Sequence, residues 1–305
     1  MNGIHHVTAI AGSPQENIDF YAGVLGLRLV KRTVNFDDPL TYHLYYGTEI
    51  GAPGTILTFF AWPNSFPGRP GNGQVNATAL AVPVGSLGWW QERFNGNLVS
   101  HDRPLRRFGE EVLPFRDKDG LPLELIAVDD DRPAWKGGGI PEQYAIRGVH
   151  CVTANEEGYE RTAVLLTETM RFLAVGQEGN RFRYRAAEGR GMIDILCTPD
   201  GPRAGGGAGS VHHIAWRVPD DADQLAWRKT LVHAGMNVSP VLDRQYFHSI
   251  YYREPGGVLF EAATDQPGFA VDEAPESLGR ALKLPPWLEQ AREQIAGGLE
   301  PIKLP

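Results

Sequence analysis

The sequence has few cysteines, no surplus of positive charge and no long apolar run. Two cysteines, Cys151 and Cys197, occur among 305 residues, which are too few for a disulfide framework. The start MNGIHHVTAI has neither the basic region nor the apolar region of a secretory signal, so we expect a cytoplasmic protein. No apolar run approaches the roughly 20 residues that cross a bilayer, and we therefore expect no membrane-spanning helix.

The charge balance also limits the partners. The formal net charge is -8 at pH 7 and the pI is near 5.6, which argues against nucleic acid or an anionic membrane surface as a partner. Hydrophobic residues make up 42% of the chain and charged residues 22%, as in proteins with sizeable folded cores. The 36 glycines and 23 prolines indicate many turns and a fold rich in short strands.

Four segments resemble one another and divide the chain into repeats. They are GIHHVTAI (3–10), NATALAVPV (76–84), RGVHCVTAN (147–155) and GSVHHIAWRV (209–218). Each is typical of a first strand, and each is followed by a helical stretch and then by β-rich runs that glycine and proline separate. The sequence therefore predicts an α+β fold of four βαβββ modules.

The modules are expected to form two pairs, with 1–135 as one domain and 140–268 as the other. The segment DDDRPAWKGGGIPEQY is the natural linker between them. In the first module Ser13 is a plausible N-cap and Pro14 the first helical residue. The remaining tail, 269–305, contains ESLGRALKLPPWLEQAREQI, which we expect to pack on the body or on a second subunit of a homo-oligomer.

A carboxylate in an apolar strand raises the question of what neutralises it. Glu261 lies in GGVLFEAAT, and a lone buried carboxylate costs several kcal/mol. Histidine doublets, His5-His6 and His212-His213, stand at the same position of the first and fourth modules. Because successive side chains of a strand point to opposite faces, one member of each doublet must face inward. Two such imidazoles and Glu261 would form a 2-His-1-carboxylate site, which leaves open positions on Fe(II) or Mn(II).

A salt bridge from Glu261 to Arg244 or Arg253, with the histidines merely packed, is the competing explanation. The two middle modules test it, because they offer an acid, Glu124, and a cysteine, Cys151, but no second histidine. We therefore expect a structural cavity there. When the four modules are aligned, the positions that correspond to Glu261 are Thr58, Glu124 and Ile195. The positions that correspond to the second histidine are Thr78 and Cys151. We expect Arg106 or Arg107 to neutralise Glu124.

The hairpin SIYYREPGGVLFEAATD (249–265) allows two registers. A two-residue turn at Pro255-Gly256 would set Ile250 opposite Glu261. A three-residue connection with a glycine bulge sets Tyr251 there instead. The Gly-Gly pair favours the second register, which we predict.

With these features the sequence resembles the vicinal oxygen chelate superfamily of glyoxalases, bleomycin resistance proteins and extradiol dioxygenases. Within it, the resemblance is to the ring-cleaving hydroquinone and chlorohydroquinone dioxygenases. It rests on GIHHVTAI, GSVHHIAWRV and DRQYFHSIYYREPGGVLFEAATD in this order, and covers about residues 1–268. The resemblance implies two vicinal-oxygen-chelate domains, an Fe(II) cofactor with Mn(II) as the alternative, and an aromatic diol and O2 as substrates.

The resemblance also implies roles for individual residues. Alternation along the first strand supports Thr8, which shares a face with His6, but it points His5 and His212 the other way. His248 fits either a pocket wall or a hydrogen-bonded surface position, and His43 is expected to be structural. The implied metal ligands are His6, His213 and Glu261, the catalytic residues Tyr251, His212 and Arg244, and the substrate-binding residues His5 and Thr8. His248 joins the substrate-binding candidates because it lies two residues after Tyr246 on the same strand.

Two other functions stay open at this stage. A glyoxalase-like isomerase would use Zn(II) or Ni(II) and typically a second acid, but the matching position of the first module is Thr58. A resistance protein that binds an aromatic ligand would lack the three metal ligands.

Overall fold

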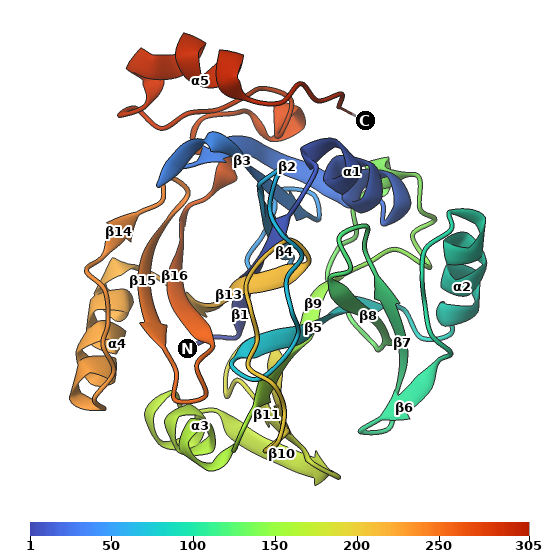
Figure 1. The fold of residues 1–305 in the computed structure, drawn as a ribbon, viewed down its shortest axis with the longest axis vertical. Coiled ribbons are helices and arrows are strands. Elements are labelled where there is room, and N and C mark those ends of the chain that lie inside the picture. The colour runs from blue at the N-terminus through green and yellow to red at the C-terminus, as the bar shows by residue number, and fades with distance from the viewer. Residues whose placement is uncertain (305) are drawn as a thin grey trace.

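The protein, described here over residues 1–304 of a computed structural model, is built on two eight-stranded sheets (Figure 1). Along the first sheet the order is β14 (Leu242–Asp243), β15 (Phe247–Arg253), β16 (Leu259–Pro267), β13 (Ser210–Val218), β1 (Ile4–Ala11), β4 (Ile56–Ala61), β3 (Asp38–Gly47) and β2 (Arg28–Asn35). Along the second it is β10 (Leu173–Glu178), β11 (Arg181–Arg185), β12 (Met192–Cys197), β9 (Gly148–Glu156), β5 (Gln74–Val82), β8 (Pro122–Ala127), β7 (Glu110–Arg116) and β6 (Leu105–Arg107).

The four predicted βαβββ modules and the α+β class are confirmed. Modules one and four meet, as the predicted site of His6, His213 and Glu261 requires, although the chain was expected to divide into pairs of consecutive modules. The first strand of module one, β1, pairs antiparallel with β13 of module four. In the same way β5 of module two pairs with β9 of module three. The predicted halves, 1–135 and 140–268, therefore each contribute one module to each sheet. The two sheets therefore do not coincide with the two halves of the chain. Modules one and four form the first sheet, and modules two and three form the second.

Short helices cover the outer faces of the sheets (Figure 1). Ser13 caps the first helix as predicted, because its side chain accepts the N–H of Glu16, and Pro14 is the first helical residue. Among residues 1–304 no helix is long and apolar enough to span a membrane. The module helices are α1 (Pro14–Ile18) with the π-helical turn Asp19–Val24, α2 (Leu87–Gly96), α3 (Glu160–Val164) with the π-helical turn Leu165–Thr169, and α4 (Asp221–His233).

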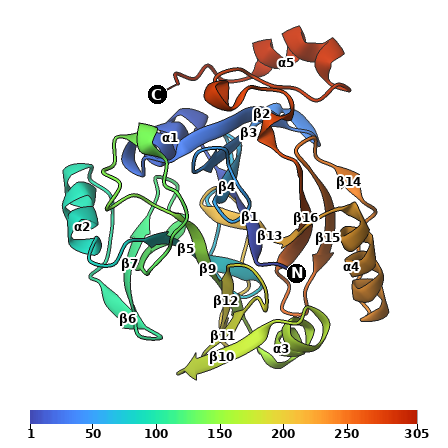
Figure 2. The same cartoon turned by 180° about the vertical axis from the view of Figure 1, so that it is seen from behind.

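The C-terminal tail packs across β2 and β3 of its own chain, which is one of the two places predicted for it (Figures 1 and 2). The fully buried ammonium group of Lys31 on β2 lies 2.5 Å from Asp272 and 2.6 Å from Glu273. Leu284 and Ile295 of the tail are buried in the main apolar core. The tail contains α5 (Arg292–Gly298) and the 3-10 turns Phe269–Val271, Pro275–Ser277 and Glu289–Ala291, and a further 3-10 turn, Lys136–Gly138, lies in the predicted linker.

Two buried carboxyl groups share one hydroxyl where the third module meets the fourth. Thr162 Oγ1 lies 2.6 Å from Glu156 Oε2 and 2.5 Å from Glu254 Oε2. One hydroxyl proton serves only one of these contacts, so the other requires a protonated carboxyl group. Backbone N–H groups of Gly256 and Val258 donate to Glu254 and favour its ionised form. Glu156 therefore holds the proton, and burial together with the charge of Glu254 raises the pKa of Glu156 to about 9.

We predict that this junction loses stability as the pH rises. The pKa of Glu156 in the folded protein, about 9, lies above its ordinary value of 4.5. The protonated form therefore stabilises the fold fully below about pH 4.5, and this contribution declines as the pH rises through about 9. Glu156→Gln supplies a permanent N–H donor to Thr162. Its thermal unfolding midpoint should fall less between about pH 6 and about pH 9.5 than that of the unmodified protein.

Glu157→Gln provides the matched control, because Glu157 is the exposed neighbour on the same segment. Its midpoint should follow that of the unmodified protein at both pH values. Equal pH dependence of all three proteins would contradict the assignment of the proton to Glu156.

Candidate metal centre

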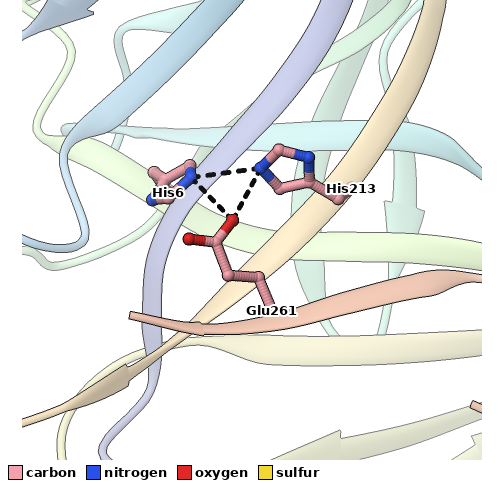
Figure 3. A group of neighbouring side chains, drawn as sticks. All are labelled: His6, His213 and Glu261. Atoms are coloured by element: carbon pink, nitrogen blue, oxygen red, sulfur yellow. Dashed lines mark hydrogen bonds and ion pairs between the residues drawn. The ribbon is translucent and has the colours of Figure 1, made fainter. Parts of the chain in front are cut away.

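Three side chains from the first and fourth modules converge inside the first sheet (Figure 3). They are His6 on β1, His213 on β13 and Glu261 on β16. Glu261 Oε2 lies 2.8 Å from His213 Nε2 and 3.4 Å from His6 Nε2, and the two Nε2 atoms are 3.3 Å apart. The exposed fraction of each residue is 4% or less. The structure thus brings together the three residues that the sequence proposed as ligands.

The strand register explains the convergence. His6 lies opposite Ala215 on β13, and Ala215 lies opposite Glu261 on β16, so these three residues form one row across three adjacent strands. His213 precedes Ala215 by two residues and therefore shares its face of the sheet. Because the side chain of Ala215 is a single methyl group, it leaves the space above the row in which the longer side chains meet.

The hydrogen-bonding state of the three residues suits a divalent cation. Burial raises the pKa of Glu261, but the neighbouring His6 and His213 lower it by more than burial raises it. The net pKa is well below its ordinary value, and Glu261 is ionised. Its Oε1 atom accepts a hydrogen bond from Ser249, whereas its buried Oε2 atom faces the Nε2 atoms of His213 and His6. When both Nε2 atoms carry lone pairs, this ionised oxygen has no donor beside it, which is costly, and a cation held by the two imidazoles and the carboxylate would remove that cost.

The first histidine of each doublet fixes the orientation of the second. His5 Nδ1 lies 2.9 Å from His6 Nδ1, and His212 Nδ1 lies 2.8 Å from His213 Nδ1. If each inner ring donates its Nδ1–H to its neighbour, the lone pair of its Nε2 atom faces Glu261, which is the form that binds a metal. His5 is 2% exposed and lies behind His6 outside the cavity lining, whereas His212 lines the cavity. Burial, reinforced by His6, lowers the pKa of His5 to about 3, which keeps this ring neutral.

A cavity of about 300 Å³ adjoins the three residues. This volume lies at the lower end of the range of small-molecule sites, roughly 300–1,000 Å³, and suits a ligand of one aromatic ring. Aromatic and aliphatic side chains form much of its wall, which excludes water from the interior. The lining consists of His6, Asn35, Phe36, Asp37, His43, Tyr45, Phe60, Trp62, His212, His213, Arg244, Phe247, Tyr251 and Leu259.

Tyr251 lies directly opposite Glu261, so the predicted register of the hairpin is confirmed. Arg244 Nε donates to Tyr251 Oη at 3.3 Å, and Arg244 Nη1 lies 3.0 Å from Asp37 Oδ2. Burial and the charge of Glu261 raise the pKa of Tyr251, so its hydroxyl keeps its proton. Arg253 instead donates to the carbonyl oxygen of its own hairpin turn. The salt bridge that competed with the metal hypothesis is therefore absent from the described residues 1–304.

All three residues expected to bind substrate lie outside the cavity lining, and His5, which packs behind His6, is one of them. His248 is outside the cavity, and its Nδ1 atom is 2.6 Å from Asp221 Oδ1 on α4. This corrects the sequence expectation: along β15 the residues Ser249 and Tyr251 face the site, and alternation turns His248 to the helix side. Thr8 is fully buried, and its Oγ1 atom contacts Thr58 Oγ1 at 2.9 Å rather than lining the cavity.

Sequence reasoning missed two lining residues on β3. His43, expected to be structural, lines the cavity together with Tyr45. A hydrogen-bonded chain links Tyr45 Oη to His43 Nδ1 at 2.9 Å, His43 Nε2 to Thr58 Oγ1 at 2.8 Å, and Thr58 to Thr8. The spacing of two between His43 and Tyr45 on a strand was the available signal, because it places both on one face.

The middle modules hold arginine where the outer modules offer metal ligands. Arg107 forms a two-point ion pair with Glu124 at 2.8 and 2.9 Å, as one of the two predicted partners, whereas Arg106 faces Glu111. The strand register also corrects the alignment, because the relation between His213 and Glu261 recurs between Ala77 and Glu124 and between Cys151 and Asp194. Ala77 and Asp194 thus replace Thr78 and Ile195, and Asp194 is paired with Arg183 at 2.7 Å.

Comparisons with known proteins agree with this architecture. Residues 3–125 and 160–262 match the family described as the Glyoxalase/Bleomycin resistance protein/Dioxygenase superfamily. A Bacillus subtilis protein named provisionally as the ring-cleaving dioxygenase MhqO is 49% identical over 99% of this chain and 97% of its own. The chlorohydroquinone/hydroquinone 1,2-dioxygenase of Sphingobium indicum is 36% identical over 97% and 95%.

Solved structures give the same picture of the fold. A crystal structure from Bacillus subtilis, described provisionally as a dioxygenase, superposes with a TM-score of 0.95 at 49% identity and covers 99% of this chain and 98% of its own. Glyoxalase I from Zea mays superposes with a TM-score of 0.65 at 12% identity, over 86% of this chain and 92% of that one. At this low identity the second likeness concerns the fold alone.

We predict that each of the variants His6→Gln, His213→Gln and Glu261→Gln loses its bound divalent metal. Each change removes one of the three donors, so reconstituted protein should carry well below one metal ion per chain after gel filtration, as measured by elemental mass spectrometry. His248→Gln is the matched control, because it changes a histidine of the same sheet outside the cavity. Full metal content in all three site variants would refute the ligand assignment.

Proposed function

The chain belongs to the glyoxalase/bleomycin resistance protein/dioxygenase superfamily, and from this we propose that it is a ring-cleaving dioxygenase of the extradiol type. Its substrate would be a hydroquinone, substituted or not, or a related aromatic diol, and its cofactor a single non-haem Fe(II), with Mn(II) as the alternative. The observation that carries the proposal is the meeting of His6, His213 and Glu261 beside a cavity of single-ring size. The names of the full-length relatives support the reaction class and the diol substrate.

The donor set fits the proposed cofactor. Two imidazoles and one carboxylate are the ligands that leave adjacent positions open on non-haem iron. When bound, Fe(II) would supply open positions for the diol and O2 side by side and would pass electrons from the diol to O2. The protein residues must then hold the ring, exclude water and provide donors for the charge that develops.

The aromatic wall holds the ring of the diol. Phe36, Phe60 and Phe247 line the cavity and offer apolar faces to a planar ligand. Since one ring suits the cavity volume, the ligand would be confined near the three ligand residues. Such confinement turns a collision between two molecules into a positioned reaction.

Tyr251 lies opposite Glu261 in the sheet register and lines the cavity. Its raised pKa keeps the hydroxyl protonated, so it can donate a hydrogen bond to an oxygen of the substrate. Arg244 contacts the same hydroxyl and does not give up its proton, so it acts through its positive charge on the developing anion.

His212 provides a second hydrogen-bond donor in the site. When its Nδ1 atom accepts the proton of His213 Nδ1, its own hydrogen lies on Nε2. The ring therefore offers an N–H group to the cavity that it lines. Hydrogen-bond donation, rather than proton abstraction, follows from this tautomer.

The two other functions have less support. A glyoxalase-like isomerase would need a second acid near the position of Thr58, whose hydroxyl contacts Thr8 and His43 instead. A resistance protein that only binds an aromatic ligand would leave Glu261 Oε2 ionised, buried and without a cation.

We expect protein reconstituted anaerobically with Fe(II) to consume about one O2 per hydroquinone cleaved, the stoichiometry of a dioxygenase, as followed with an oxygen electrode. Tyr251→Phe should lower kcat about a hundredfold, the usual loss of an acid-base group, while iron content is retained. Tyr252→Phe is the matched control, because that hydroxyl contacts Met170 on the other side of the strand. Absence of O2 uptake with every ortho- and para-diol, despite one bound iron per chain, would overturn the proposal.

A further inference from the structure

The cavity lining contains one ion pair, formed across its mouth by two distant segments. Of the lining residues within 1–304, Arg244 carries the one permanent positive charge and Asp37 the one carboxylate. Arg244 Nη1 lies 3.0 Å from Asp37 Oδ2. Asp37 belongs to the turn between β2 and β3, and Arg244 to the turn between β14 and β15, so the contact joins the first module to the fourth.

The turn holds Asp37 in this position. Its backbone N–H donates to the side-chain oxygen of Asn35 at 3.0 Å, and Asn35 is largely buried. The next residue, Asp38, accepts hydrogen bonds from Thr41 and from the indole N–H of Trp62. The Asp37 carboxylate is 73% exposed, whereas the Arg244 side chain is 20% exposed and faces the cavity. The fixed turn thus brings a solvated anion against a largely buried cation.

Resting on the proposed function, we propose that Asp37 restricts the substrates to aromatic diols that carry no anionic ring substituent. Asp37 occupies the cation that a carboxylate or sulfonate on the ring would need. It also repels such a group as the ligand enters, which is discrimination by an unfavourable contact.

A charge balance over the site supports this restriction. A divalent cation, Glu261, Arg244 and Asp37 together carry one net positive charge, which a singly ionised diol neutralises. A diol with an additional carboxylate leaves one negative charge in excess. Much of the remaining wall is apolar or aromatic, with Phe36, Phe60, Phe247 and Leu259 among the lining residues. An excess charge without a partner is unfavourable in such surroundings.

The test compares two ligands of the same shape. 2,5-Dihydroxybenzoate carries the extra charge, whereas 2,5-dihydroxybenzamide is its neutral counterpart. Their dissociation constants for the Fe(II)-loaded protein, measured by anaerobic titration calorimetry, give the preference for the neutral ligand without reliance on turnover. The kcat/KM values for the two compounds, from O2 uptake, give the same comparison for the reaction.

Three variants separate the ion pair from general effects of charge. Asp37→Asn removes the carboxylate and keeps a residue that turns favour. Glu49→Gln removes the same charge at an exposed position outside the lining. The double variant Asp37→Asn/Arg244→Gln removes both members of the pair and so restores the net charge of the site.

We expect the unmodified protein to prefer the amide by more than tenfold, and Asp37→Asn to reduce that preference on the order of tenfold, as for close charge pairs at binding sites. Glu49→Gln should leave the preference unchanged, and the double variant should recover it. Equal binding of the two ligands by the unmodified protein, or an unchanged preference in Asp37→Asn, would overturn the inference while hydroquinone-dependent O2 uptake still supports the proposed function. Failure of every diol to bind or react would overturn both.

Discussion

The protein depends on one close contact, in which two imidazole nitrogens and a carboxylate oxygen point at one another inside a sheet. If both rings carry their hydrogen on Nδ1 and Glu261 is ionised, the three atoms present lone pairs to a common point, which is unfavourable without a positive charge there. Much of the architecture serves this arrangement. The antiparallel pairing of β1 with β13 supplies the histidines, the parallel pairing of β13 with β16 supplies the acid, and Ala215 leaves the space between them.

The two middle modules show the same framework with the opposite solution. At the positions that correspond to Glu261 they also carry acids, Glu124 and Asp194, but guanidinium groups of Arg107 and Arg183 neutralise them. An arginine fills the space and supplies a permanent positive charge. The second sheet therefore needs no exchangeable ion at these positions. The comparison supports the view that an acid at this position of a module requires a cation, and that the sequence decides whether it is a side chain or a metal.

Local patterns in the sequence predicted the features that local physics controls. The repeat of first strands gave the modules, and strand alternation placed one histidine of each doublet inward and Thr8 on the face of His6. The resemblance identified His6 and His213 as the inward members, and the Gly-Gly pair gave the register of Tyr251. The meeting of modules one and four followed from the proposed ligand set rather than from local patterns, and the strand pairing that joins them depends on contacts between segments about two hundred residues apart. His43 was assigned to the wrong environment, and His248 was left between two environments, for a related reason: the inward face of neither strand was known before its neighbours.

The pairing of the outer modules also bears on how the chain acquires its shape during synthesis. Strands β5 and β9 belong to the second sheet, which modules two and three form, and they leave the ribosome within one short interval. The second sheet can therefore assemble early. Strand β1 emerges first but must wait for β13 and β16, which follow almost at the end. A nascent chain therefore holds an unpaired, apolar strand edge for most of its elongation. His6 and His213 therefore meet Glu261 only after nearly all of the polypeptide has been made.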